Sequence, residues 1–245
     1  MPETSPHLPG GTPPPTPGAD GIVTPEFIAS LLADGDDDLA AWAIGQALEE
    51  QPRAAVFDGL VRSAMELVGA RWESGQWTIS QEHLASVALM AALARLRPGD
   101  PAETRIGPVA VLAGPEGEQH VSGLACLAQV LEERGWRVEN LGANVPEDDL
   151  RRFLGDRSVD LVALSIGTRD RLPALRRAIG AIRASGAQVP IMVGGHGIAG
   201  IEGDIPGADL VGAALAEAER FLDTIETTAG AAGSPGKRNP ADAET

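Results

Sequence analysis

The chain is poor in several kinds of residue, and each shortage excludes a class of protein. Cys126 is the only cysteine among 245 residues, so no disulfide forms within the chain, which fits a reducing compartment. No apolar run approaches the roughly 20 residues that a membrane helix needs, and the N-terminus lacks the basic and apolar pattern of a signal peptide. We therefore expect a cytoplasmic protein with no membrane partner.

Positive charge and aromatic side chains are also scarce. Lys237 is the only lysine, no arginine precedes Arg53, and the formal net charge is −16. A chain of this charge gains little from the phosphates of a nucleic acid, so we expect no direct nucleic-acid binding. Aromatic residues make up 3% of the chain against 43% for all hydrophobic residues. Small aliphatic side chains must therefore form the core.

The composition changes along the chain and divides it into four parts. Residues 1–23 hold seven of the 19 prolines, and residues 229–245 combine Ala, Gly, Pro and charge, so both ends are predicted to be disordered tails. Residues 24–98 contain four amphipathic stretches joined by short loops, which is typical of a four-helix bundle. The predicted helices begin at Thr24-Pro25, at Asp37, near Pro52 and at a capping box, Thr78 with Gln81.

Residues 104–228 alternate strand and helix patterns, which indicates a Rossmann-like, doubly wound parallel sheet. The predicted strands are 109–113, 138–141, 161–164, 191–193 and 210–211, and the predicted helices are 121–134, 146–154, 171–184 and 216–227. Such sheets bind ligands at the carboxyl ends of their strands.

One motif with chemical potential follows the first predicted strand. It reads Glu118-x-His120-x-x-Gly123 and leads into a helix. A neutral imidazole is a common ligand of transition metals, and a carboxylate usually accepts the other ring N–H of such a histidine. Glu118 is placed to do so, and Gly123 removes a side chain from the path of a bulky ligand. The same residues also fit an ordinary loop histidine at a helix start.

A second motif, Trp72-x9-Glu82-His83, spans the end of the third predicted helix and the start of the fourth. A tight hairpin brings a flat indole and two polar side chains to one end of the bundle. Packing of the indole beside solvated polar residues would explain the same pattern. We expect His83, His120 and His196 to face one cleft between the bundle and the sheet.

The two motifs together resemble those of the cobalamin-binding module of CarH/LitR-type light sensors. This resemblance implies that His120 is the lower ligand of cobalt in place of the cofactor's own benzimidazole. It implies a slot for the displaced nucleotide tail beside Ser165, Gly194 and Gly195. It also implies that Trp72 lies over the upper face, and that Glu82 and His83 bind the ribose of adenosylcobalamin.

Two positions depart from that family's pattern. Gly167 stands where the family carries leucine, and Glu73 stands where a histidine that binds cobalt after photolysis is expected. The sequence also shows no helix-turn-helix segment before the bundle. In this it resembles the photocobilins, which pair cobalamin with a bilin. Cys126, the one residue able to tether biliverdin through sulfur, lies in a core-like helix, so a bilin would be held without a covalent bond.

The sequence therefore predicts a cobalamin-binding photosensory protein rather than an enzyme. We expect it to signal as a homo-oligomer or through a separate effector protein. The alternatives are a methyl-carrying corrinoid protein of a methyltransferase system, or a protein that stores or delivers cobalamin. The pattern Trp72-x9-Glu82-His83 favours the sensor, since it suits an adenosyl group better than an open methyl face.

Overall fold

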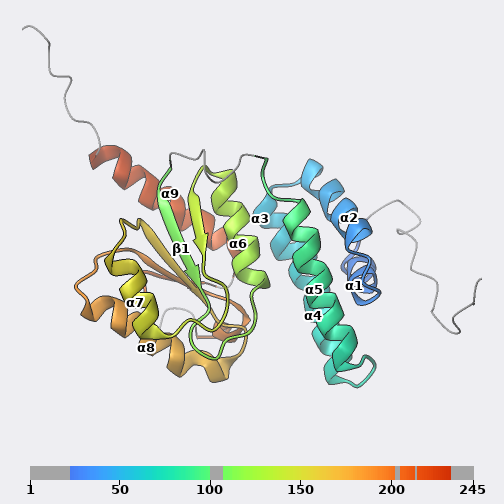
Figure 1. Cartoon of the computed structure of the whole chain (residues 1–245). Helices are drawn as coiled ribbons and strands as arrows, with labels where there is room; N and C mark the ends of the chain where they lie inside the picture. Colours follow the sequence, from blue (N-terminus) through green and yellow to red (C-terminus); the bar gives the residue numbers. More distant parts are fainter. Residues whose placement is uncertain (1–22, 100–106, 202–204, 213, 233–245) are drawn as a thin grey trace, which may run out of the picture.

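The computed structural model describes residues 23–99, 107–201, 205–212 and 214–232. Its N-terminal part is a helical cap (Figure 1), made of four helical stretches. They are α1 (Pro25–Ala33), α2 (Asp37–Glu50), a long stretch made of α3 (Arg53–Val56), η1 (Phe57–Val61) and α4 (Arg62–Glu73), and α5 (Ile79–Arg95). The predicted caps are present: the Thr24 hydroxyl accepts a hydrogen bond from the Phe27 N–H, and Thr78 and Gln81 form a capping box.

The third helical stretch differs from the uninterrupted helix predicted from Pro52 onward, because Phe57–Val61 form a π-helical segment. Asp58 lies within it, and its carboxylate accepts hydrogen bonds from the N–H groups of Leu215 and Ala216, at 3.0 and 3.1 Å. The cap thus supplies the N-terminal cap of a helix in the sheet domain. A π-helical turn places a residue out of the regular helical register, and such turns are frequent at functional sites.

The second part of the chain is a five-stranded parallel sheet, in the order β2-β1-β3-β4-β5. Its strands are β1 (Val109–Ala113), β2 (Arg137–Asn140), β3 (Leu161–Ser165), β4 (Ile191–Gly194) and β5 (Leu210–Val211). The helices are α6 (Ser122–Glu133), α7 (Glu147–Gly155), α8 (Leu172–Ala184) and α9 (Leu215–Ala232), with 3-10 turns η3 (Arg169–Arg171) and η4 (His196–Ile198). The predicted Rossmann-like fold is confirmed, and β2 begins one residue earlier than predicted.

The predicted start of the C-terminal tail, residue 229, falls inside α9. This helix continues to Ala232, and alanines at 229, 231 and 232 favour its extension because alanine has the highest helix propensity. The rest of both predicted tails, residues 1–22 and 233–245, lies outside the described residues, as do residues 104–106 at the predicted start of the sheet domain.

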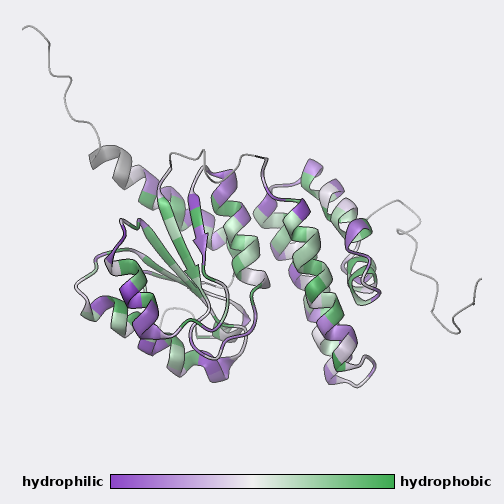
Figure 2. Ribbon diagram, in the orientation of Figure 1, coloured by the Kyte–Doolittle hydropathy of each residue, from purple (hydrophilic) through white to green (hydrophobic). Residues whose placement is uncertain are grey.

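Helices cover both faces of the sheet, and alternate residues of each strand point to opposite sides. Val111 and Ala113 of β1 pack with Leu175 and Ile179 of α8, whereas Leu112 of the same strand packs in the cluster that includes residues of α6 and α9. Figure 2 shows most strands in green at the centre of this domain, whereas the edge strand β2 carries hydrophilic residues in purple. Among the described helices, none has a hydrophobic stretch that could span a bilayer.

The cap contacts the sheet domain along α6. Cys126 and Val130 of α6 belong to the cap's own hydrophobic core. The Gln129 side chain donates a hydrogen bond to the Leu93 carbonyl (2.6 Å) and accepts one from Arg53 (2.8 Å). Arg97 forms an ion pair with the fully buried carboxylate of Glu132. These contacts lie near the carboxyl end of α5, while the α4–α5 hairpin extends away from them (Figure 1).

Candidate functional site

The loops after β1 and β3 meet at the switch point of the sheet. From β1 the chain continues to β2 on one side of it and then crosses to β3 on the other side. Ligands of doubly wound sheets bind in this crevice. The loop after β1 carries Glu118 and His120 before α6 begins, and the loop after β3 begins at Ile166. One hydrogen bond joins the two loops: the Gly167 N–H donates to Glu118 Oε2, at 2.7 Å.

The Glu118 carboxylate is the centre of this site, with only 1% of the residue exposed. Its Oε1 accepts hydrogen bonds from the N–H groups of Gln119 and His120, at 2.8 and 2.7 Å, and lies 2.6 Å from His120 Nδ1. Burial raises the pKa of this carboxyl, but the hydrogen bonds from the His120 ring and from three backbone N–H groups outweigh burial and hold the pKa at about 2. Glu118 is therefore ionised at neutral pH and fixed in place.

The His120 imidazole is held by Glu118 on one side and is open on the other, with 59% of the side chain exposed. The hydrogen bond to Glu118 raises the pKa of His120, burial lowers it, and the negative charges of Glu118, Glu82 and Asp170 raise it further, so that it lies above its ordinary value. In the neutral ring with its proton on Nδ1, the Nδ1–H group donates a hydrogen bond to Glu118. Nε2 is then free to bind a metal.

Three of the predicted site residues lie at or beside the ends of β3 and β4. A Cβ atom added at Gly123 would lie 3.6 Å from Ser165 Oγ, which places position 123 against the end of β3 at an ordinary contact distance. Gly195 has a φ of +97°, and a Cβ there would come within 2.2 Å of the Ile166 carbonyl oxygen. A side chain at 195 would therefore be strained and would collide with the loop after β3. Gly194 is the last residue of β4.

Gly167, where the resemblance predicts leucine, has a structural reason to be glycine. A Cβ atom at this position would lie 2.3 Å from His120 Nδ1 and 2.4 Å from its Cγ. The imidazole occupies the space that a side chain would need. Spacing in the sequence does not show this contact, because the residues are 47 positions apart.

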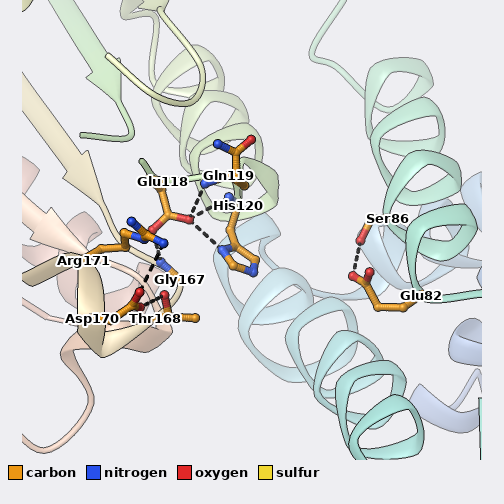
Figure 3. A network of polar contacts seen from close by, with 9 residues as sticks. All are labelled: Glu82, Ser86, Glu118, Gln119, His120, Gly167, Thr168, Asp170 and Arg171. Carbon is orange, nitrogen blue, oxygen red and sulfur yellow. Dashed lines mark hydrogen bonds and ion pairs between the residues drawn. The ribbon is translucent and has the colours of Figure 1, made fainter. Parts of the chain in front are cut away.

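The cap contributes the facing side of the site. Figure 3 shows Glu82 of α5 across from His120, with Ser86 beside it. The Ser86 hydroxyl donates to Glu82 Oε1 (3.0 Å), and His83 Nε2 lies 3.6 Å from Glu82 Oε2. The negative charge of Glu82 raises the pKa of His120, after the larger effects of Glu118 and burial. The two sides are therefore within electrostatic reach of each other. Ser86 was missed, although a four-residue spacing places it on the same helix face as Glu82.

The remaining predicted residues lie at the edges of this arrangement. Trp72 is near the end of α4 and 43% exposed, and the side chain of His83 is 72% exposed. His196 begins η4, just after β4, at the same sheet edge as His120. The structure thus places His120 and His196 at the carboxyl ends of strands and His83 on the facing helix.

Among the described residues, His120 belongs to no cluster of metal-binding side chains, which limits the kind of metal that can bind there. Within the described part of the chain, no group of three or more His, Cys, Asp or Glu side chains could hold a metal ion. A metal that binds through His120 must therefore bring most of its ligands with it, as a macrocyclic cofactor does. A buried, ionised carboxylate behind one exposed imidazole suits the axial position of such a metal.

Comparison with known proteins agrees with this chemistry. Two families, each described as a B12 binding domain, match the chain, one over residues 26–97 and the other over residues 108–225. The HTH-type transcriptional repressors CarA and CarH of Myxococcus xanthus are each 35% identical to it, over 58% and 62% of this chain. The chain spans about half the length of these repressors, 48% and 50% respectively.

Corrinoid proteins are similar over more of their own length. Dimethylamine corrinoid protein 1 of Methanosarcina acetivorans is 26% identical over 74% of this chain and 87% of that protein. The solved structure of the Methanosarcina barkeri monomethylamine corrinoid protein covers 82% of this chain and 96% of its own, with a TM-score of 0.65 and 17% identity. That similarity shows a shared fold.

The fold and the two family matches define a cobalamin-binding module. Residues 108–225 are its B12 binding domain over the sheet, and residues 26–97 are the matching helical domain.

Proposed function

We propose that this module is a light sensor that holds cobalamin between the cap and the sheet edge, with His120 as the lower ligand of cobalt. The observation that carries the proposal is the Glu118–His120 pair at the switch point, with Nδ1 engaged and the ring open toward α5. Bound adenosylcobalamin would supply a cobalt–carbon bond that light breaks. The chain itself binds, orients and responds, and we infer that it catalyses no reaction.

The lower side of the site suits a cofactor whose own base is displaced. Glu118 fixes the His120 tautomer, which leaves Nε2 as the metal donor. Gly123, Ser165, Gly194 and Gly195 would line the slot for the nucleotide tail. Position 123 lies at an ordinary contact distance from Ser165 Oγ, so these two residues would share one wall of the slot.

The upper side favours a sensor. Trp72 is partly exposed near the end of α4, Glu82 of α5 lies across from His120 (Figure 3), and His83 follows Glu82 on the same helix. These residues would contact the adenosyl group in the dark and lose that contact after light. A ligand shifts a conformational equilibrium only through different contacts in the two states, and the cap supplies such a difference.

The contacts between the cap and the sheet domain suggest how a change at the upper face would be transmitted through the protein. Arg53, Asp58 and Arg97 anchor the cap to α6 and α9, so loss of contact at the hairpin would tilt the cap about that anchor. We propose that the altered cap surface changes a homo-oligomer or the binding of a separate effector protein.

The light-induced product should carry no second histidine from position 73. Glu73 occupies the position after Trp72 at which that histidine is expected. The histidine that the cap does contain, His83, lies on the other side of the α4–α5 hairpin. We expect an illuminated spectrum without bis-imidazole cobalt, unless His83 moves in through a rearrangement of the hairpin around Gly75. A bis-imidazole spectrum that survives His83→Ala would contradict this reasoning.

A bilin, if bound beside the corrin, would be held without a covalent bond. Cys126 is buried in the cap core, and burial raises the pKa of its thiol to about 12. Co-expression with enzymes that make biliverdin tests the second chromophore. A sample with no red-absorbing band would leave a sensor that uses cobalamin alone.

A methyl-carrying corrinoid protein is the second candidate, because the similarity covers 87% of the length of dimethylamine corrinoid protein 1. One experiment separates the two functions. The purified protein is loaded with adenosylcobalamin or methylcobalamin, and absorption spectra and oligomeric state are measured in darkness and after green light. A sensor would change colour and oligomeric state when loaded with the adenosyl form, whereas a carrier would pass the methyl group to an added thiolate in darkness, with the electron pair of the broken bond left on cobalt(I).

The same experiment has a matched pair of variants. Trp72→Ala should weaken retention of adenosylcobalamin in darkness, because we propose that the indole covers the upper face. Trp42→Ala removes an indole of α2 that is similarly exposed, at 53% against 43%, and should behave as the wild type. Equal behaviour of both variants would contradict the assigned role of Trp72.

A further inference from the structure

We propose that Gly167 is the residue that positions the His120 imidazole, by leaving empty the space into which the ring is set. The proposal rests on the proposed function of His120 and deepens it. A Cβ atom at position 167 would lie 2.3 Å from His120 Nδ1, 2.4 Å from Cγ and 2.8 Å from Cβ. All three of the nearest atoms belong to one side chain, so the ring packs directly on the Gly167 backbone.

The conformation of the backbone does not require glycine at this position. Gly167 is absent from the glycines with positive φ, whereas Gly195 at the neighbouring strand end has a φ of +97°. Alanine could therefore adopt the Gly167 backbone without strain. Space for the imidazole is the reason for glycine that the structure provides.

Gly167 is also tied to the group that orients the ring. Its N–H donates to Glu118 Oε2 (2.7 Å), while Glu118 Oε1 lies 2.6 Å from His120 Nδ1. The Glu118 carboxylate thus bridges the Gly167 backbone and the His120 imidazole that packs on it. The three residues form a unit in which each fixes the position of the others.

A methyl group at position 167 would push the His120 imidazole in one direction, away from the Gly167 backbone. The backbone under the ring is held by the bond to Glu118, whereas 59% of the His120 side chain is exposed. The imidazole would therefore move outward and lose its contact with Glu118. Loss of the orienting partner of a metal-bound histidine typically lowers metal affinity roughly 10–100-fold, and we expect a loss of this size for cobalamin in Gly167→Ala.

The first test uses the protein without cofactor. Nitrogen NMR of the histidine rings at one fixed pH reports whether Nδ1 of His120 carries the proton that Glu118 accepts, and His120→Ala identifies the signal. We expect this signature in the wild type and in Gly180→Ala, a control at an exposed α8 position with open space around it. It should be lost in Gly167→Ala. An unchanged signature in Gly167→Ala would overturn the proposal.

The second test is a double-mutant cycle of cobalamin affinity. Because the added methyl group acts by displacing the ring, Gly167→Ala should cost nothing further in a chain that already carries His120→Ala. A full additional loss in the double variant would show that position 167 acts on something other than His120, and would overturn the proposal. If the wild type bound no cobalamin, the proposed function would fail, while the NMR comparison would still decide the role of Gly167.

Discussion

Replacement of Glu118 by glutamine should destabilise the protein without its cofactor, and should do so in a way that depends on pH. The carboxylate has two oxygens, and both are engaged: Oε1 with Gln119 and His120, and Oε2 with Gly167. A carboxamide keeps one acceptor oxygen and turns an NH2 group toward donors. At least one buried N–H then loses its partner.

The size of the effect follows from the pKa of Glu118. Folding lowers it from 4.5 to about 2, and each pKa unit corresponds to about 1.4 kcal/mol. The ionised carboxylate therefore stabilises the fold by about 3 kcal/mol at neutral pH. Because Glu118 is almost completely buried, solvent screening reduces this little. We expect Glu118→Gln to lose about 2–3 kcal/mol, as for hydrogen bonds to a buried charge.

The sign of the pH dependence is fixed by the direction of the shift. A lowered pKa contributes stability that is fully present above the unfolded value of 4.5 and is lost as the pH falls toward about 2. The wild type should therefore lose its advantage over Glu118→Gln between pH 4.5 and 2. The difference should also become smaller as the pH rises above 6.5, because Glu118 raises the pKa of His120 and the stability from a raised pKa is lost at high pH.

Urea unfolding at several pH values measures this difference. Glu116→Gln is the matched control, since Glu116 lies in the same loop, is half exposed, and pairs with Arg177 on the surface. We expect it to cost less than about 0.5 kcal/mol. A Glu118→Gln difference that is equally large at pH 3 and pH 6, or no larger than that of the control, would refute the reasoning.

Three further outcomes follow from the structure. Asp58→Ala should cost about 1–2 kcal/mol in urea unfolding because it removes the cap of α9, and Asp58→Asn should restore most of it; equal losses would contradict the capping role. Cys126 should resist maleimide at neutral pH and react once urea unfolds the chain, since burial raises its thiol pKa to about 12; rapid labelling of the native protein would contradict this. With a net charge of −16, the chain should give no shift of DNA in a gel at physiological salt, and a sequence-specific shift would contradict that expectation.

Local patterns were enough to predict most of the fold. Apolar runs bounded by turn residues predicted all five strands to within one or two residues, and Thr24 and Thr78 marked helix starts because capping depends on neighbours in the sequence. The Glu118–His120 contact was predictable for the same reason, since the two residues are two positions apart.

The contacts that the sequence did not reveal join distant residues. Asp58 caps a helix that begins 157 positions later, and the π-helical segment around it has no local signature. The family pattern marks Gly167 as a departure, whereas the structure explains the glycine by the imidazole that packs on it. Such contacts depend on how the cap and the loops come together in three dimensions, which periodicity does not encode.

The central claim is that His120 of this chain binds cobalt in the assembled module. The most direct measurement is electron paramagnetic resonance of the protein loaded with cobalamin and reduced to the cobalt(II) state. Because nitrogen-14 and nitrogen-15 have different nuclear spins, the axial nitrogen splits the signal into triplets or doublets. We expect triplets in unlabelled protein, doublets when its histidines carry nitrogen-15, and loss of the imidazole splitting in His120→Ala. Triplets that persist in the wild type despite labelled histidine, or doublets that survive in labelled His120→Ala, would show that a base other than His120 binds the cobalt and would contradict the account.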